Sequence, residues 1–327
     1  MYNAPIAHGS PRALRSFMAR IKLTCIYLCT PLLLVCACNH KDAQHHVNKE
    51  STTPTIITTD DYELVFAGNS QSLLVLFPCF PCDALNTKQE LPIVDAALSS
   101  GIAIMLMNFN QRLWLSQEEK DSLHSIITEA AKAHSLPTED IYIGGFSSGG
   151  NVSLLLADYI GSSKSDLSVS GVFIVDSPVD LLALYQGAHK IVERDFSQPA
   201  IMEANMIINK FDRQFGQGDS SLQVYQERSP YTAQSHTVNN LSHLQDVEIR
   251  LYSEPDTAWW RENRQTPYED MNAHHIERME EDLRKLYGDA AVHYIKTNDR
   301  GYRANGVRHP HSWAIVDAEE LIQWINK

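Results

Sequence analysis

Short apolar runs alternate with longer amphipathic segments from residue 62 onward. Several runs, such as IAIMLM at 102–107, are almost continuous in large apolar residues, which is typical of strands covered on both faces. The pattern predicts strands at 62–67, 72–77, 102–107, 141–145, 171–176, 247–252 and 291–296. It predicts helices at 88–100, 117–134, 148–160, 268–287 and 317–326. This alternation indicates an α/β fold with a mainly parallel central sheet flanked by helices.

One stretch interrupts the alternation. About seventy residues separate the strand that ends at Asp176 from the strand that starts at Val247, far more than one crossover needs. The stretch is helical in pattern at 179–192 and 199–215. We therefore expect a helical cap insertion at about 185–240, over the carboxyl ends of the strands, where ligands bind in open α/β sheets.

The N-terminal segment has a different character. Basic residues between positions 12 and 22 precede an apolar run at 23–37, a pattern typical of a secretory signal and short for a membrane-spanning helix. The run ends in Val-Cys-Ala-Cys38, and this boundary resembles the lipobox of bacterial lipoproteins. The resemblance implies a signal peptide at 1–37 and lipidation of Cys38; the alternative is an uncleaved membrane anchor. Polar residues at 38–60 then predict a flexible tether to a domain at 61–327.

Charge and cysteine content narrow the function classes. The formal net charge of −13 provides no basic field for nucleic acid, so we expect no nucleic-acid partner. Four of the six cysteines lie in the N-terminal segment and its boundary, leaving Cys79 and Cys82 in the body of the chain. The body is therefore not a disulfide scaffold.

The strongest chemical signal is Gly145-Phe146-Ser147-Ser148-Gly149, a G-x-S-x-G motif between an expected strand and an expected helix. Ser147 would lie on a turn too tight for neighbouring side chains, which explains the two glycines. The helix that follows would direct backbone N–H groups at the reacting atoms. This context predicts that Ser147 is a nucleophile; the alternative is an ordinary glycine-rich turn.

With this motif in place, the chain from about 62 to 325 resembles the α/β-hydrolase superfamily, of the esterase/lipase or prolyl-oligopeptidase type. In that superfamily the triad residues follow in the order serine, acid, histidine, with the acid after a later strand. The resemblance implies that Asp256, just past the penultimate strand, is the acid. Glu254 is a local competitor; Asp176 and Asp180 follow the preceding strand, from which some relatives take the acid.

The resemblance also implies a histidine near the C-terminus. The segment His309-Pro310-His311-Ser312-Trp313 resembles the histidine loop of many esterase-like members, and we assign the base to His311, with His309 as its rival. Two histidines at this spacing can also ligate a metal, but a third ligand nearby is missing. We therefore expect no metal and no organic cofactor.

Two N–H groups should hold the oxyanion of an acyl-transfer reaction. One is the N–H of Ser148; the other should come from the loop Pro78-Cys79-Phe80-Pro81-Cys82, where relatives carry a glycine-rich sequence. Because prolines have no N–H, Cys79 or Phe80 remains, and position favours Phe80. The same loop has a C-x-P-C pattern that mimics a thioredoxin-type redox site; a structural disulfide and two buried thiols are the other interpretations.

Together these features predict a serine hydrolase that cleaves a carboxylic ester and is held by its lipid at a bacterial cell envelope, on the outer membrane. Small esters or carbohydrate esters are the expected substrates, and Trp259 and Trp260 would either stack on a sugar, line an acyl pocket or simply pack. Two alternatives stay open. A serine peptidase is suggested by the segment 225–233, which is similar to the corresponding part of prolyl-oligopeptidase-like enzymes, and a catalytically inactive binding lipoprotein is the other.

Overall fold

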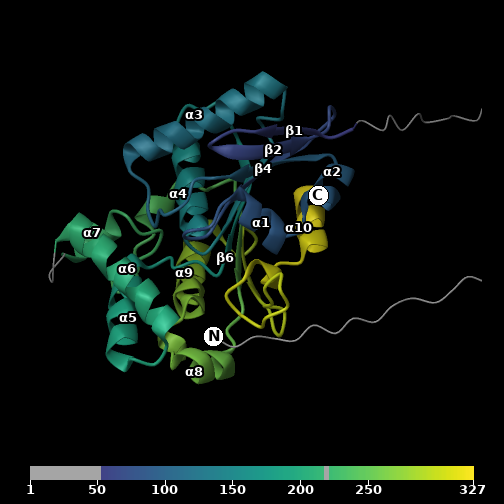
Figure 1. Cartoon of the computed structure of the whole chain (residues 1–327). Coiled ribbons are helices and arrows are strands. Elements are labelled where there is room, and N and C mark those ends of the chain that lie inside the picture. Colours follow the sequence, from purple (N-terminus) through teal and green to yellow (C-terminus); the bar gives the residue numbers. More distant parts are fainter. Residues whose placement is uncertain (1–52, 217–220) are drawn as a thin grey trace, which may run out of the picture. The chain divides into compact units, whose positions relative to one another are not determined.

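The computed structural model describes residues 53–216 and 221–327 (Figure 1). The expected signal peptide, Cys38 and the first part of the expected tether lie outside the described residues. The strands are β1 (Thr55–Thr58), β2 (Tyr62–Phe66), β3 (Ser72–Phe77), β4 (Ile102–Met107), β5 (Ile141–Phe146), β6 (Val169–Val175), β7 (Glu248–Ser253) and β8 (Val292–Lys296). The helices are α1 (Ala84–Glu90), α2 (Val94–Ser99), α3 (Gln117–His134), α4 (Ser148–Ser162), α5 (Leu181–Arg194), α6 (Gln198–Phe215), α7 (Leu222–Gln226), α8 (Thr257–Arg264), α9 (Asn272–Tyr287) and α10 (Ala318–Ile325).

All described strands belong to one sheet, in the order β1-β2-β4-β3-β5-β6-β7-β8. The pairs from β4 to β8 are parallel, whereas β2 is antiparallel to both β1 and β4. The predicted α/β class with a mainly parallel sheet is therefore confirmed. Parallel order places the carboxyl ends of β3, β5, β6 and β7 along one edge, where the functional residues were expected.

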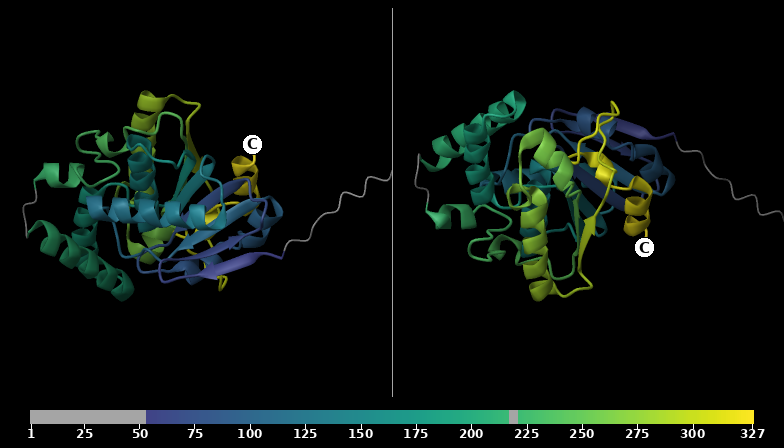
Figure 2. Two further views of the ribbon diagram at one scale, coloured as in Figure 1. Left: turned by 90° about the horizontal axis from the view of Figure 1, so that it is seen from above. Right: turned by 90° about the horizontal axis from the view of Figure 1, so that it is seen from below.

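Alternate side chains of the strands enter two separate cores. On one face, Val75, Ile143 and Ile174 pack with residues of α3, α4 and α9. On the other, Leu76 and Val175 pack with residues of α1, α2 and α10. Figure 2 shows the sheet between these two sets of helices. Burial on both faces explains why the strands read as continuous apolar runs rather than alternating ones.

Three differences from the sequence expectations have local causes. Residues Thr55–Thr58, expected within the tether, pair with β2 as an edge strand. The helix expected at 88–100 is two helices, since Pro92 disfavours helical backbone at the residue before it. The segment after Glu254, where no helix was predicted, contains α8, whose N-cap is Asp256.

The long insertion between β6 and β7 contains α5, α6 and α7, which we call the cap helices. Figure 1 shows α5 and α6 side by side and outside the two layers that cover the sheet. The rings of Tyr185 (α5), Phe211 (α6) and Tyr225 (α7) pack on one another, with centroids 5.5 to 6.4 Å apart. An aromatic cluster of this kind fixes the helices to each other. No helix in the described part of the chain combines the length and apolar character needed to cross a membrane.

Asn151 of α4 ties together two loops at the carboxyl edge of the sheet. Its buried Nδ2 donates to the carbonyl oxygen of Leu113 (3.1 Å) and to that of Pro178 (2.9 Å). We expect Asn151→Ala to lower the free energy of unfolding by about 2–3 kcal/mol, because two buried carbonyl groups lose their donor. Denaturant titration measures this change. Asn205→Ala on the exposed side of α6 is the matched control, and an equal loss in both variants would contradict the assignment.

Candidate active site

Ser147 occupies a sharp turn between β5 and α4. Its backbone has φ 54° and ψ −123°, a conformation that a residue with a side chain rarely adopts. A hydrogen bond from its N–H to the carbonyl oxygen of Val175 (2.9 Å) holds the turn against β6. A Cβ on Gly145 would lie 2.2 Å from the backbone of Gly149, and one on Gly149 would lie 2.5 Å from the Phe77 oxygen. Both glycines are thus required by close backbone packing, as the motif predicts.

His311 is held by a buried carboxylate. Its Nδ1 lies 2.6 Å from Oδ2 of Asp176, which follows β6 and is 6% exposed. Asp176 is itself fixed, since its N–H donates to Tyr252 (2.8 Å) and its carbonyl oxygen accepts from Asn272 Nδ2 (2.8 Å). The ring of His311 packs on Phe146, with centroids 4.6 Å apart. A carboxylate on Nδ1 leaves Nε2 as the nitrogen that exchanges a proton with a nucleophile.

The expectation that Asp256 holds this histidine is wrong. Oδ1 of Asp256 caps α8 by accepting from the N–H of Trp259 (2.9 Å), and Oδ2 accepts from Arg308 (2.7 Å). Both oxygens are therefore engaged in fixing α8 and the loop before His309. Of the carboxylates weighed from the sequence, the structure brings Asp176 to His311.

The other two carboxylates have structural positions. Glu254 is buried beneath the loop at 297–308, where it accepts from the N–H of Arg300 (2.9 Å) and pairs with Arg308 (2.5 Å). Asp180 caps α5 through Ala183 (3.0 Å) and accepts from the N–H of Ala233 (2.8 Å). Glu254 thus shapes the loop that leads to the histidines, and Asp180 joins the first cap helix to the end of the insertion.

A pocket of about 210 Å³ joins the predicted residues. Ser147, Ser148, Phe80, His309 and His311 all line it. The cap helices contribute mainly small or apolar residues, namely Ala183, Leu184, Gly187, Ala188, Ile191, Ala200, Ala204 and Ile207. Trp260, Arg264, Thr266 and His275 add a more polar part of the lining. Ser147 and His311 therefore share one cavity, and most of its lining from the cap is apolar.

The expected oxyanion donors lie on the two segments that meet at this pocket. Ser148 is the buried first residue of α4. The loop after β3 touches the same turn, since a Cβ on Gly149 would be 2.5 Å from the oxygens of both Phe77 and Pro78. Contact between these segments places the Phe80 loop beside the first turn of α4. The backbone N–H groups of Ser148 and Phe80 stay predictions as donors.

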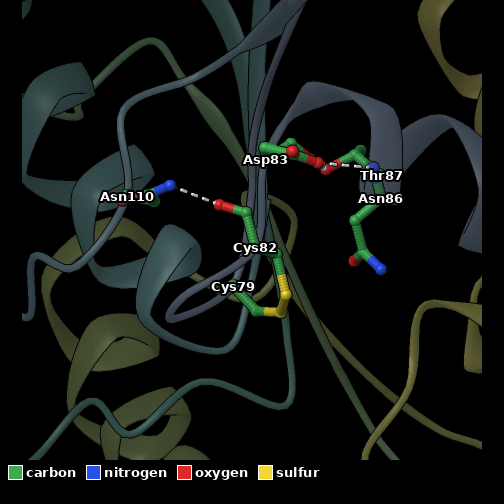
Figure 3. The surroundings of a disulfide bond; sticks show 6 residues. All are labelled: Cys79, Cys82, Asp83, Asn86, Thr87 and Asn110. Carbon is green, nitrogen blue, oxygen red and sulfur yellow. Dashed lines mark hydrogen bonds between the residues drawn. A yellow bond between two sulfur atoms is a disulfide. The ribbon is translucent and has the colours of Figure 1, made fainter.

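Cys79 and Cys82 form a disulfide on either side of Phe80 (Figure 3). Asn110 donates from Nδ2 to the carbonyl oxygen of Cys82 (2.7 Å), and Asp83 caps α1 through Asn86 (2.8 Å). Of the interpretations left open by the sequence, the structure selects the disulfide over two buried thiols.

His309 has a different environment from His311. Its ring lies 4.8 Å from that of Trp259 and 6.2 Å from that of His311, between centroids. Burial, together with the nearby His311, Arg303 and Arg264, lowers the pKa of His309 to about 3. It is therefore neutral at physiological pH. Among the described residues, no group of three metal-ligating side chains is positioned to hold an ion.

The lowered pKa of His309 predicts a loss of stability in acid. In the unfolded state His309 takes up a proton as the pH falls below its ordinary pKa of 6.5, whereas in the folded state it does so only near pH 3. The free energy of unfolding therefore falls as the pH drops through this window. We expect the wild type to lose about 1 kcal/mol more than His309→Gln between pH 7 and pH 5, after allowing for solvent screening. Unfolding titrations at both pH values test this, and equal losses in the two proteins would contradict the pKa of His309.

Neither a family model nor a curated protein sequence matches the chain. Solved structures do match. MPT51 of Mycobacterium tuberculosis is 14% identical, with 84% of this chain and 98% of that chain covered and a TM-score of 0.50. The fluorophosphonate-binding serine hydrolase F of Staphylococcus aureus is 12% identical, with 85% and 98% covered and a TM-score of 0.50. Carboxyl esterase 2 of Tuber melanosporum is 13% identical, with 86% and 87% covered and a TM-score of 0.50. The order of strands in the sheet, the sharp turn at Ser147 and the similarity to these solved structures together show that the chain has the α/β-hydrolase fold.

Proposed function

We propose that this protein is a serine hydrolase that cleaves carboxylic esters through an acyl-enzyme. The observation that carries the proposal is the arrangement around one pocket: a serine on a strained turn, and a histidine whose Nδ1 is bonded to the buried Asp176. Two of the structures with the same fold are named as an esterase and a fluorophosphonate-binding serine hydrolase, and these names add support.

In the proposed reaction, the Ser147 hydroxyl attacks the ester carbonyl while Nε2 of His311 takes its proton. The tetrahedral intermediate collapses when His311 returns the proton to the leaving alcohol, which leaves an acyl group on Ser147. Water then attacks the acyl-enzyme while His311 takes its proton. The second tetrahedral intermediate collapses as His311 returns that proton to the Ser147 oxygen, and the carboxylic acid is released. Asp176 orients the imidazole and stabilises the imidazolium during both steps.

The oxyanion of both intermediates would accept hydrogen bonds from the N–H groups of Ser148 and Phe80. Ser148 is at the N-terminus of α4, where the helix dipole also favours negative charge. Donors that are fixed before the reaction stabilise the transition state without a cost of reorganisation.

We also propose that the protein is exported and held by a lipid on Cys38 at a bacterial cell envelope, on the outer membrane. The basic segment, the apolar run and the Val-Cys-Ala-Cys38 boundary support this location. Esters of small molecules or carbohydrates would reach the domain there. A polar alcohol of this kind suits the part of the pocket lined by Arg264, Thr266 and His275.

Four proteins test the proposed triad: the wild type, Ser147→Ala, Asp176→Asn and Asp256→Asn. We expect Ser147→Ala to abolish labelling by a fluorophosphonate probe and hydrolysis of p-nitrophenyl esters. Asp176→Asn should lower kcat by about 10⁴-fold, because His311 would adopt the wrong tautomer. Asp256→Asn is the matched control and should keep kcat within about threefold of the wild type, since its carboxylate does not touch His311.

The same proteins discriminate the alternatives. Labelling that persists in Ser147→Ala would end the assignment of the nucleophile. Rapid cleavage of a dipeptidyl substrate with little ester hydrolysis would favour a serine peptidase. A wild type that neither labels nor hydrolyses any acyl ester would leave the binding lipoprotein as the better interpretation.

The cap side of the pocket predicts which acyl groups fit. Gly187 of α5 lines the pocket, and a Cβ built on it meets no atom within 4 Å. A larger side chain there would occupy space that we assign to an apolar acyl chain. Gly187→Leu should therefore lower the ratio of kcat/KM for octanoyl to acetyl esters by about tenfold, with acetyl hydrolysis retained. Gly187→Ala fits the open space and is the control; an unchanged ratio in Gly187→Leu would place the acyl chain elsewhere.

A further inference from the structure

We propose that the Cys79–Cys82 disulfide positions the N–H of Phe80, so that the rate of ester hydrolysis depends on the redox state of this pair. The inference rests on the proposed function and deepens it. It treats the disulfide as a positioning element of the oxyanion site, because neither sulfur contacts the substrate in the proposed reaction.

The loop has little backbone bonding capacity of its own. Pro78 and Pro81 lack N–H groups, so two of the five residues at 78–82 cannot donate a backbone hydrogen bond. The N–H of Cys82 donates to the carbonyl oxygen of Cys79 (2.7 Å), which closes a turn around Phe80. The disulfide closes the same turn covalently, with 4.9 Å between the two Cα atoms.

The two ends of this turn are anchored unequally. At the start, the oxygens of Phe77 and Pro78 lie against the backbone of Gly149, which is the second residue of α4. At the end, Asn110 Nδ2 donates to the carbonyl oxygen of Cys82 (2.7 Å; Figure 3). Phe80 lies between these anchors and lines the pocket, where Lys210 of the cap lies 5.7 Å from the centre of its ring. The disulfide therefore adds a second covalent link, beside the backbone itself, between the anchored ends on either side of the proposed donor.

The disulfide is open to a small reductant from one side. Cys79 is buried, whereas Cys82 is partly exposed. A thiolate of dithiothreitol would attack the Cys82 sulfur and displace Cys79 as a thiolate. The second thiol of the reductant then closes on the mixed disulfide and releases Cys82. The protein gains two electrons and two protons, and dithiothreitol becomes its cyclic disulfide.

Reduction of the disulfide should weaken stabilisation of the transition state more than it weakens binding of the substrate. Removal of one oxyanion donor costs about 10² to 10³ in kcat in serine hydrolases, and a donor that is present but no longer fixed should cost less. We expect kcat to fall about 10- to 100-fold, with KM within about twofold, because the oxyanion forms only after attack. The four-residue turn is short, so the fold itself should remain.

The test uses the full chain in detergent, as the wild type and as the Cys79→Ser/Cys82→Ser double variant. A variant with the four N-terminal cysteines (Cys25, Cys29, Cys36 and Cys38) changed to Ser keeps the disulfide but cannot carry the proposed lipid. It is the control for the thiol titration, which then reports the pair alone. For each protein, kcat and KM on a p-nitrophenyl ester are measured before reduction, after reduction and after reoxidation. Binding of a trifluoromethyl ketone, which forms a tetrahedral adduct, is compared with binding of the carboxylic acid product.

We expect the control variant and the wild type to lose kcat on reduction, to recover it on reoxidation, and to bind the ketone more weakly with unchanged product binding. The double variant should have the low kcat throughout and no response to dithiothreitol. Unchanged kcat with two titrated thiols per control chain would overturn the inference alone. A fall in kcat that is accompanied by a rise in KM and a loss of thermal stability would also overturn the inference, since that result indicates a folding role. Absence of hydrolysis and of fluorophosphonate labelling in the oxidised wild type would overturn the proposed function and this inference with it.

Discussion

The close packing of backbone around Ser147 is the constraint on which the rest of the site depends. A Cβ on Gly145 would meet the backbone of Gly149, and a Cβ on Gly149 would meet the carbonyl oxygens at the end of β3. Neither glycine has room for a side chain, and Ser147 itself has positive φ. Such strain persists only where the surroundings determine it. Here the surroundings are β6, which accepts the N–H of Ser147 through Val175, and the end of β3, which lies on Gly149. The turn therefore brings three strand ends to one point, and each contributes a part of the proposed machinery.

Charged groups position the histidine side of the pocket. Glu254 is buried at the end of β7 and binds the backbone at Arg300 and Gly301 as well as the guanidinium of Arg308. A buried carboxylate is costly unless it is paired and fully hydrogen-bonded, and Glu254 meets both conditions. Asp256 shares Arg308 and caps α8. The carboxylates after β7 thus support the loop that presents His311, while the carboxylate after β6 contacts its ring.

This division explains which parts of the molecule could be predicted from the sequence. The strands from β2 to β8 follow from their apolar runs, and Ser147 and His311 follow from local motifs. The carboxylate that contacts His311 could not be assigned in this way, because the ends of β6 and β7 are neighbours at one sheet edge: Asp176 donates its N–H to Tyr252 of β7. Both strands present carboxylates there, and the choice between them depends on side-chain directions that residue spacing does not encode.

The pairing of Cys79 with Cys82 was undetermined for a similar reason, because a C-x-P-C pattern is compatible with thiols as well as a disulfide. Residues 55–58 were missed because a four-residue edge strand has no extended apolar run.

The opposite side of the pocket is built by different means. The loop at 78–82 has two prolines and a disulfide. The cap helices present mainly small or apolar residues, and Glu203 and Lys210 of α6 are their charged contributions to the pocket. The histidine side relies on buried charges that fix one ring, because a base must keep its tautomer through two proton transfers. The oxyanion side must present a backbone N–H at a fixed position without a competing acceptor, and covalent restraint achieves this without adding charge to the pocket. In the proposed complex the acyl chain would lie against the apolar cap, while the carbonyl oxygen of the same acyl group would meet the proposed donors on the core. The acyl group would therefore span the boundary between cap and core.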